Sequence, residues 1–218
     1  MKTVSIIIPT LNEAEAIREV IDDIPKDVLK KMDYDTEIIV VDGGSTDGTV
    51  GKLDGLDVRV IKEDDGKANA VRKGFSNSEG EYLFLIDGDG SYPAERIVDM
   101  IELLEHGYDM VLGSRFAGTI DKGAMSFRNK IGNKILTWMG NRFYGTSVSD
   151  LCTGLRGMRA GELDSIPGEG FEVEAGIHMV MSGKRIKEIP IEYEKRKGKS
   201  KLHLWDGLRI GWRLLKGV

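Results

Sequence analysis

Tyr82-Leu-Phe-Leu-Ile-Asp-Gly-Asp89 is a short apolar run that ends in two acidic residues. Runs of this kind are typical of strands that are covered on both faces of a sheet. Similar runs occupy residues 4–8, 37–41, 58–61 and 110–112, and apolar residues at helical spacing lie between them at 17–24, 68–75 and 97–104. This alternation predicts an α/β fold, a mostly parallel twisted sheet with helices on both faces.

The second half of the chain is less regular. Residues 126–143 and 172–182 have helical patterns, residues 185–193 alternate as a strand does, and residues 149–156 read as a loop. No linker, low-complexity segment or internal repeat interrupts the chain. We therefore predict a single domain over residues 1–201, followed by a basic amphipathic C-terminal helix over residues 202–218.

The composition is that of a globular protein, with 40% hydrophobic and 31% charged residues in a chain of 218. A single cysteine, Cys152, excludes a disulfide scaffold, and no Cys/His cluster is spaced for structural zinc. The N-terminal apolar run soon meets a proline, and no run approaches the roughly 20 residues of a membrane span. These features predict a soluble, cytoplasmic protein.

The formal net charge of −5 conceals an asymmetry along the chain. Residues 195–218 carry +7, so residues 1–194 carry −12. A basic end on an acidic body favours an anionic partner, such as phosphate or lipid headgroups, although a solubilising tail has the same composition. The sequence shows no aromatic stacking platform beside the basic residues, so we expect no nucleic-acid partner.

The C-terminal segment has the pattern of an amphipathic helix. On a helical wheel one face carries Leu204, Leu208, Trp212 and Leu215, with Trp205 at its edge and Arg209, Arg213 and Lys216 beside it. Such a helix can lie in a membrane interface, or it can pack its apolar stripe on the domain. The sequence leaves both alternatives open.

Two carboxylates follow the apolar strand directly, Asp87 and Asp89. Acids on one short turn repel each other unless a cation lies between them. Mg²⁺ and Mn²⁺ accept carboxylate oxygens and often complete their coordination with substrate phosphates. The pair therefore predicts a site for Mg²⁺ or Mn²⁺, and the alternative is an acidic surface turn that caps the next helix.

A second polar turn, Asp42-Gly-Gly-Ser-Thr-Asp-Gly-Thr49, follows the run at 37–41. Asp42 could hold a base or ribose, or the turn could simply connect a strand to a helix. The chain has neither the GxxxxGK[ST] phosphate loop nor a GxGxxG after its first strand. ATPase and dinucleotide-dehydrogenase functions therefore lose their usual support.

Seven motifs, in order along the chain, resemble one enzyme family. Pro9-Thr-Leu-Asn-Glu13, residues 41–49 and residues 87–89 resemble the family-two glycosyltransferases, which have the A-type nucleotide-sugar fold. Gly113-Ser-Arg115 and residues 126–130, 150–156 and 196–202 are similar to motifs of the polyprenyl-phosphate members, the dolichol-phosphate mannose and glucose synthases.

The resemblance implies a role for each matching residue. Pro9, Leu11, Glu13 and Asp42 would line the nucleoside pocket, and Asp87 and Asp89 would hold the metal on the donor diphosphate. Ser91 stands where relatives commonly have a glutamine ligand, which makes it a weak third ligand. Arg115, Arg128 and Arg196 would bind phosphate oxygens through their guanidinium forks. Residues 1–115 would form the donor half and residues 116–201 the acceptor half.

The resemblance also implies the reaction, an inverting transfer of a hexosyl group from a GDP- or UDP-linked sugar to a polyprenyl (dolichyl-type) phosphate. Asp89, Asp150 and Arg128 would be the catalytic residues, with Asp150 orienting the acceptor. If the acceptor were a hydroxyl, Asp150 would instead be the general base. A non-catalytic nucleotide-sugar-binding protein is a third alternative. The implied setting is protein glycosylation, with peripheral contact at the cytoplasmic face of a membrane.

Overall fold

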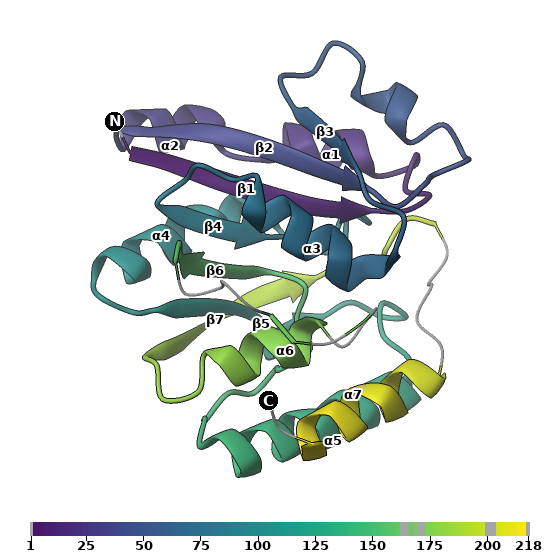
Figure 1. Ribbon diagram of the computed structural model, residues 1–218, viewed down its shortest axis with the longest axis vertical. Coiled ribbons are helices and arrows are strands. Elements are labelled where there is room, and N and C mark those ends of the chain that lie inside the picture. The colour runs from purple at the N-terminus through teal and green to yellow at the C-terminus, as the bar shows by residue number, and fades with distance from the viewer. Residues whose placement is uncertain (1, 162–165, 168, 170–172, 199–203, 217–218) are drawn as a thin grey trace.

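The computed structural model describes all residues except 1, 162–165, 168, 170–172, 199–203 and 217–218, and the side chains of residues 204–206. In the described chain seven strands form one sheet in the order β3-β2-β1-β4-β6-β5-β7 (Figure 1). The strands are β1 (Lys2–Thr10), β2 (Tyr34–Asp42), β3 (Arg59–Lys62), β4 (Tyr82–Leu85), β5 (Met110–Ile120), β6 (Arg156–Arg159) and β7 (Ile186–Tyr193). The predicted α/β fold with a mostly parallel sheet is confirmed.

Helices cover both faces of the sheet, as the continuous apolar strands predict. They are α1 (Ile17–Asp22), α2 (Lys26–Lys31), α3 (Gly66–Ser76), α4 (Ile97–Glu105), α5 (Phe127–Tyr144), α6 (Val173–Val180) and α7 (Leu204–Lys216), with 3₁₀ turns at Val50–Leu53 and Ala94–Arg96. Apolar residues of α1, α2 and α4 join the core on one face, and those of α3, α5, α6 and α7 join it on the other.

The central strand β1 shows how the sequence builds both layers. Ile6 and Ile8 point into the core beneath α1 and α4, whereas Ile7 points into the core beneath α3. All three are fully buried because successive side chains of a strand face opposite sides of the sheet. A strand buried on both sides needs an unbroken apolar run, which is what residues 4–8 provide.

One strand differs from the prediction. Residues 156–159 form β6, which pairs antiparallel with both β4 and β5. The segment Arg-Gly-Met-Arg lacks an apolar run, so its sequence gives no strand signal. Arg156 is nonetheless fully buried, because its guanidinium donates to backbone oxygens of Leu151, Thr153 and Glu174.

Strand β5 is longer than the apolar run at 110–112 that predicted it. It continues to Ile120, and exposed and half-buried residues alternate along its second half. The expected boundary between donor and acceptor halves, after Arg115, therefore falls inside a strand that pairs with β7. Among the described residues no helix is both long enough and apolar enough to cross a bilayer.

Candidate active site

The carboxyl ends of three parallel strands meet at one edge of the sheet. Strand β1 pairs with β2 so that Pro9 lies opposite Val41 and Thr10 opposite Asp42, and it pairs with β4 on its other side. Asp87 follows β4 by two residues. The fold thus brings the nucleoside motifs and the carboxylate turn, which are far apart in sequence, to the same edge.

Asp42 is buried and organises its own turn. Its carboxylate accepts the backbone N–H groups of Gly44 and Ser45, each at 3.1 Å. Gly44 has a φ of 86°, a left-handed conformation that glycine adopts without steric cost. Leu11, by contrast, is 39% exposed beside this turn, and an exposed leucine next to a buried carboxylate offers a surface against which a planar base can pack.

The loop after β1 is joined to the turn after β2 by hydrogen bonds. The Asn12 carboxamide oxygen accepts the backbone N–H of Thr46 at 2.8 Å, and the Glu13 N–H donates to the Thr49 hydroxyl at 2.9 Å. These bonds join the two segments that carry the residues predicted to line the nucleoside pocket.

Asp87 is held by a lysine that the sequence analysis did not single out. Lys67 Nζ lies 2.9 Å from Asp87 Oδ1 and 2.6 Å from Glu174 Oε1, so one cation joins α3, the carboxylate turn and α6. Burial alone raises the pKa of Asp87, but the charge of Lys67 and its hydrogen bond outweigh burial and hold that pKa below its usual range. Asp87 is therefore ionised at neutral pH.

Asp89 has a second cation as its partner. The Arg196 guanidinium donates to Asp89 Oδ2 and lies 4.0 Å from Glu13, while Ser91 donates its backbone N–H and its hydroxyl, at 3.0 and 2.5 Å, to Asp89 Oδ1. Ser91 thus orients Asp89 in this structure. Each acid of the predicted metal pair therefore faces a basic side chain, as a site for anionic ligands requires.

Arg115 and Asp150 form a third ion pair, next to the carboxylate turn. Nε and Nη2 of Arg115 donate to the two Asp150 oxygens at 2.6 and 2.7 Å, and the Arg115 backbone N–H adds a bond of 3.0 Å. Asp150 is fully buried. The Tyr92 hydroxyl oxygen accepts the backbone N–H of Gly154 at 2.7 Å.

Arg128, unlike these groups, lies at the surface. It is exposed in the first turn of α5, which Ser126 caps by accepting the Asn129 N–H at 3.2 Å. The structure brings Asp87, Asp89, Arg115, Asp150 and Arg196 to one region but leaves Arg128 at the surface. In the motif 196–202, which begins with Arg196, residues 199–202 lie outside the described residues.

Two site residues, Lys67 and Glu174, were missed from the sequence. A lysine in the first turn of a helix is opposed by the helix dipole, and Lys67 occupies that position in α3. That unfavourable placement is a signal that the charge is needed at this point. Glu174 gives no comparable signal, because only the tertiary fold brings α6 to α3.

The donor atoms present fit a divalent ion that arrives with its substrate. Among the described residues no three His, Cys, Asp or Glu side chains cluster so as to hold a metal alone. Asp87 and Asp89 provide two carboxylates, and Mg²⁺ or Mn²⁺ commonly binds through one or two carboxylates, with water and substrate phosphates as its other ligands.

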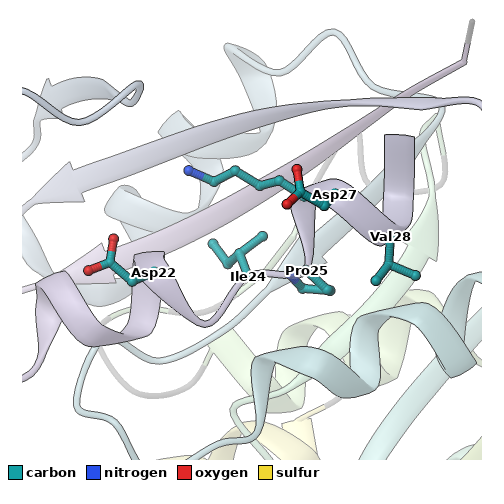
Figure 2. Close-up of a pocket in the computed structure, with 6 residues that line it drawn as sticks. Asp22, Ile24, Pro25, Asp27 and Val28 are labelled. Carbon is teal, nitrogen blue, oxygen red and sulfur yellow. The ribbon is translucent and has the colours of Figure 1, made fainter. Parts of the chain in front are cut away.

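A separate depression of about 260 Å³ lies between α1 and α2. Asp22, Ile24, Pro25, Lys26, Asp27 and Val28 line it. Figure 2 shows Asp22 and Asp27 on separate helices, without a common point toward which their side chains converge. This arrangement offers no cluster of chemical groups comparable to the one at residues 87–89.

The sequence of this chain is similar to those of known proteins. The family described as "Glycosyl transferase family 2" matches residues 5–166. Glycosyltransferase AglJ of Haloferax volcanii is 33% identical over 95% of this chain and 68% of its own. A dolichyl-phosphate hexose transferase of the same organism is 32% identical over 97% and 92%. The dolichol-phosphate mannosyltransferase of Pyrococcus furiosus is 30% identical over 98% and 64%.

Solved structures show the same fold. Glucosyl-3-phosphoglycerate synthase of Mycobacterium tuberculosis, crystallised with Mn²⁺ and UDP, has a TM-score of 0.73 at 22% identity and covers 98% of this chain and 77% of its own. Mannosyl-3-phosphoglycerate synthase of Rubrobacter xylanophilus has a TM-score of 0.74 at 21% identity, covering 99% and 72%. The A-type fold implied by the motifs is therefore confirmed, and the chain is a glycosyltransferase that belongs to glycosyl transferase family 2.

Proposed function

We propose that this enzyme transfers a hexosyl group, with inversion and with a divalent metal, from a nucleotide diphosphate sugar to a polyprenyl phosphate. The observation that carries the choice of acceptor is the pairing of Asp150 with Arg115. Both oxygens of Asp150 already accept N–H donors, so a role as general base requires this buried pair to open. A phosphate acceptor is anionic near neutral pH and attacks without such a base.

On the donor side, the hydrogen-bonded loops around Asp42 would hold the nucleoside. Asp87 and Asp89 would hold a divalent ion, which when bound would supply charge that stabilises the departing diphosphate. Ser91 keeps Asp89 in orientation. Arg196, already beside Asp89, binds the diphosphate oxygens.

The state of Cys152, a nucleophilic side chain in this region, also favours a direct displacement. Burial raises the pKa of the Cys152 thiol to about 12, so the thiol is protonated at neutral pH. A double displacement through a covalent sugar–sulfur intermediate would need a thiolate. The raised pKa argues against Cys152 as a nucleophile, and in our proposal the acceptor phosphate attacks the anomeric carbon itself, so that one displacement inverts its configuration.

A groove beside Arg115 supports a lipid acceptor. It has a volume of about 370 Å³, and it combines apolar and basic side chains. Its lining residues are Arg115, Phe116, Gly118, Ile120, Phe127, Lys130, Ile131 and Lys134. An isoprenoid chain can bury apolar surface on the phenylalanines and isoleucines while the basic residues attract its phosphate.

The named relatives support the same acceptor class, since two of those described above are called dolichyl- or dolichol-phosphate transferases. We further propose that the enzyme acts in glycosylation at the cytoplasmic face of a membrane. The analogy does not choose between GDP- and UDP-linked donors, so both belong in the test.

The test is to incubate the purified protein with radiolabelled GDP- or UDP-sugars and a short-chain polyprenyl phosphate, with Mg²⁺, Mn²⁺ or EDTA. We expect label in the organic phase with one donor and a divalent ion only. Asp89→Asn removes one charge at nearly constant volume, so it should abolish this product, whereas Asp121→Asn at the exposed end of β5 should not. Label found only on soluble hydroxyl acceptors would contradict the proposal and favour a hydroxyl acceptor.

A further inference from the structure

Large exposed apolar side chains gather on two helices. The described chain has twelve such residues, and eight of them lie on α5 or α7. They are Phe127, Ile131, Ile135, Trp138, Phe143, Leu208, Trp212 and Leu215. Helices α5 and α7 pack side by side at one end of the molecule (Figure 1). Surface patches of this kind mark interaction sites.

Helix α5 presents an apolar stripe outward. Phe127, Ile131, Ile135 and Trp138 follow each other at spacings of four, four and three, which places them on one face. They are 45–76% exposed, while Leu136 on the other side of the helix is 7% exposed. The stripe is therefore not used to pack α5 on the domain.

Helix α7 has two apolar faces, one buried and one exposed. Ile210 and Leu214 are 4% and 1% exposed and join the core beneath α5 and α6. Leu208, Trp212 and Leu215, on the face that the helical wheel identified, are 56–61% exposed. The described residues of the stripe that the helical wheel identified are thus exposed, and a second face of the helix, which the sequence analysis did not name, packs on the domain. The side chains of Leu204 and Trp205 lie outside the described part of the chain.

Basic residues accompany this apolar surface. Helix α5 has four, with no acidic residue, and α7 has three with the single acid Asp206. Lys216 Nζ lies 5.4 Å from the centre of the Trp212 ring. All three tryptophans of the chain belong to α5 or α7. Tryptophan and basic residues around an apolar stripe are the composition of helices that lie in a membrane interface.

We propose that the outward faces of α5 and α7, here called the two-helix surface, bind together to an anionic lipid bilayer. Charge decides against the other simple occupant, a second copy of the chain. A two-fold symmetric contact would place the basic residues of one copy against those of the other. Anionic headgroups instead complement these charges, and the interfacial region accepts the tryptophans and isoleucines.

This inference goes beyond the transfer reaction, and it explains how the enzyme could reach a polyprenyl phosphate in a lipid bilayer. Phe127 and Ile131 belong both to the two-helix surface and to the groove that reaches Arg115. The groove therefore opens where the protein would touch lipid. Lipid binding itself requires neither donor nor metal, so it can be measured apart from catalysis.

Intrinsic fluorescence provides a direct assay, because every tryptophan lies on the two helices. The protein is mixed with vesicles of phosphatidylglycerol and phosphatidylcholine, or of phosphatidylcholine alone. We expect a blue shift and quenching by brominated lipid with the anionic vesicles, weakened by salt. Co-sedimentation with the same vesicles gives the bound fraction.

Paired variants test the surface without removing the tryptophans. Ile135→Ser with Leu208→Ser should weaken vesicle binding at least tenfold, and Arg142→Gln with Arg209→Gln should weaken it mainly at low salt. Val28→Ser with Val60→Ser is the matched control, since both valines are 43% exposed on other elements. Circular dichroism verifies that each variant is folded.

Three results would overturn the inference. The first is wild-type protein that does not bind anionic vesicles, and the second is apolar variants that bind as tightly as wild type. The third concerns a second copy of the chain as occupant: apolar variants that lose a dimer in sedimentation velocity but still bind vesicles would assign the surface to that copy. Asp89→Asn should bind vesicles normally while it lacks transfer activity. Failure of catalysis and failure of lipid binding are therefore distinguishable.

Discussion

Arg115 and Asp150 are joined by two parallel hydrogen bonds of 2.6 and 2.7 Å in the interior, and the Arg115 backbone N–H reinforces the pair. Because Arg115 belongs to β5 and Asp150 to the loop before β6, the pair fixes that loop against the sheet. The Arg115 guanidinium also lies 5.3 Å from the Tyr193 ring centre, so three segments meet at one cation. The two side chains therefore orient each other in this structure.

Asp150→Asn should destabilise the protein by about 3 kcal/mol or more, because it leaves the buried Arg115 charge without its counter-ion. Activity should fall with it, yet the shape of the pH–rate profile should stay the same. Urea unfolding and kcat against pH measure the two effects, with exposed Asp121→Asn as the control. Loss of the acidic limb of the profile in the variant would instead assign Asp150 as a general base.

Lys67→Met should cost about 3 kcal/mol of stability, since it leaves two carboxylates, Asp87 and Glu174, without their shared cation. Adding Glu174→Gln should recover part of that loss by removing one of the two charges. Lys73→Met, at an exposed position of the same helix, is the matched control. If the double variant is as unstable as the sum of the single ones, the three groups do not form a coupled unit.

Arg196→Lys keeps the charge beside Asp89 but loses the planar fork, so turnover should fall at least tenfold, as one charge-assisted contact is worth roughly 1.5–3 kcal/mol. Steady-state kinetics with varied donor concentration, which give kcat and the donor KM, measure this loss.

Arg128→Lys should lower activity by a similar factor, but through the acceptor KM, because Arg128 lies at the surface near the groove. Arg142→Lys, at the far end of α5, is the control. Wild-type activity in both the Arg196 and the Arg128 variant would show that neither arginine binds phosphate through its planar fork.

His178 should make the protein sensitive to acid. Burial, helped by the nearby charge of Arg156, lowers the pKa of His178 to about 4, below the 6.5 expected in the unfolded chain. The unfolded state thus binds the extra proton first, so stability is complete above pH 6.5 and falls by about 3 kcal/mol as the pH drops toward 4.

His178→Gln tests this origin of acid sensitivity. The variant can retain a hydrogen bond to Thr146, which lies 2.7 Å from His178 Nε2. Its stability should change less between pH 6.5 and 4 than that of wild type, as measured by urea unfolding at several pH values. His106→Gln, at an exposed histidine, serves for comparison. If the free energy of unfolding of the His178 variant depends on pH as steeply as that of wild type, other groups cause the loss of stability in acid.

The edge of the sheet that carries the site was predictable from local sequence. Apolar runs such as residues 4–8 and 82–86 indicate buried parallel strands, and such strands end at a common edge. Asp42 and Asp87 therefore had to lie at the same edge of the sheet. The short strand β6 was not predictable, because Arg156 and Arg159 donate hydrogen bonds to the backbone oxygens of Glu174 and Leu104, which are distant in the chain.

The partners of the site residues depend on the tertiary fold. Lys67 and Asp87 are 20 residues apart, and Arg196 and Asp89 are 107 apart, so spacing along the chain says nothing of their contact. Only packing selects which cation neutralises which acid. Ser91 shows the same limit, since its position matches a ligand motif while its hydroxyl donates to Asp89.

The sequence by itself determined the α/β fold, the carboxylate turn and the amphipathic character of the last helix, because each depends on residues that are neighbours in a strand, turn or helix. Tertiary structure alone decided that Asp150 is held by Arg115, and that Ile210 of α7 faces inward while Trp212 faces outward. A helical wheel shows two apolar stripes but not which one the domain covers, because that choice depends on the free energy of packing against residues distant in the chain.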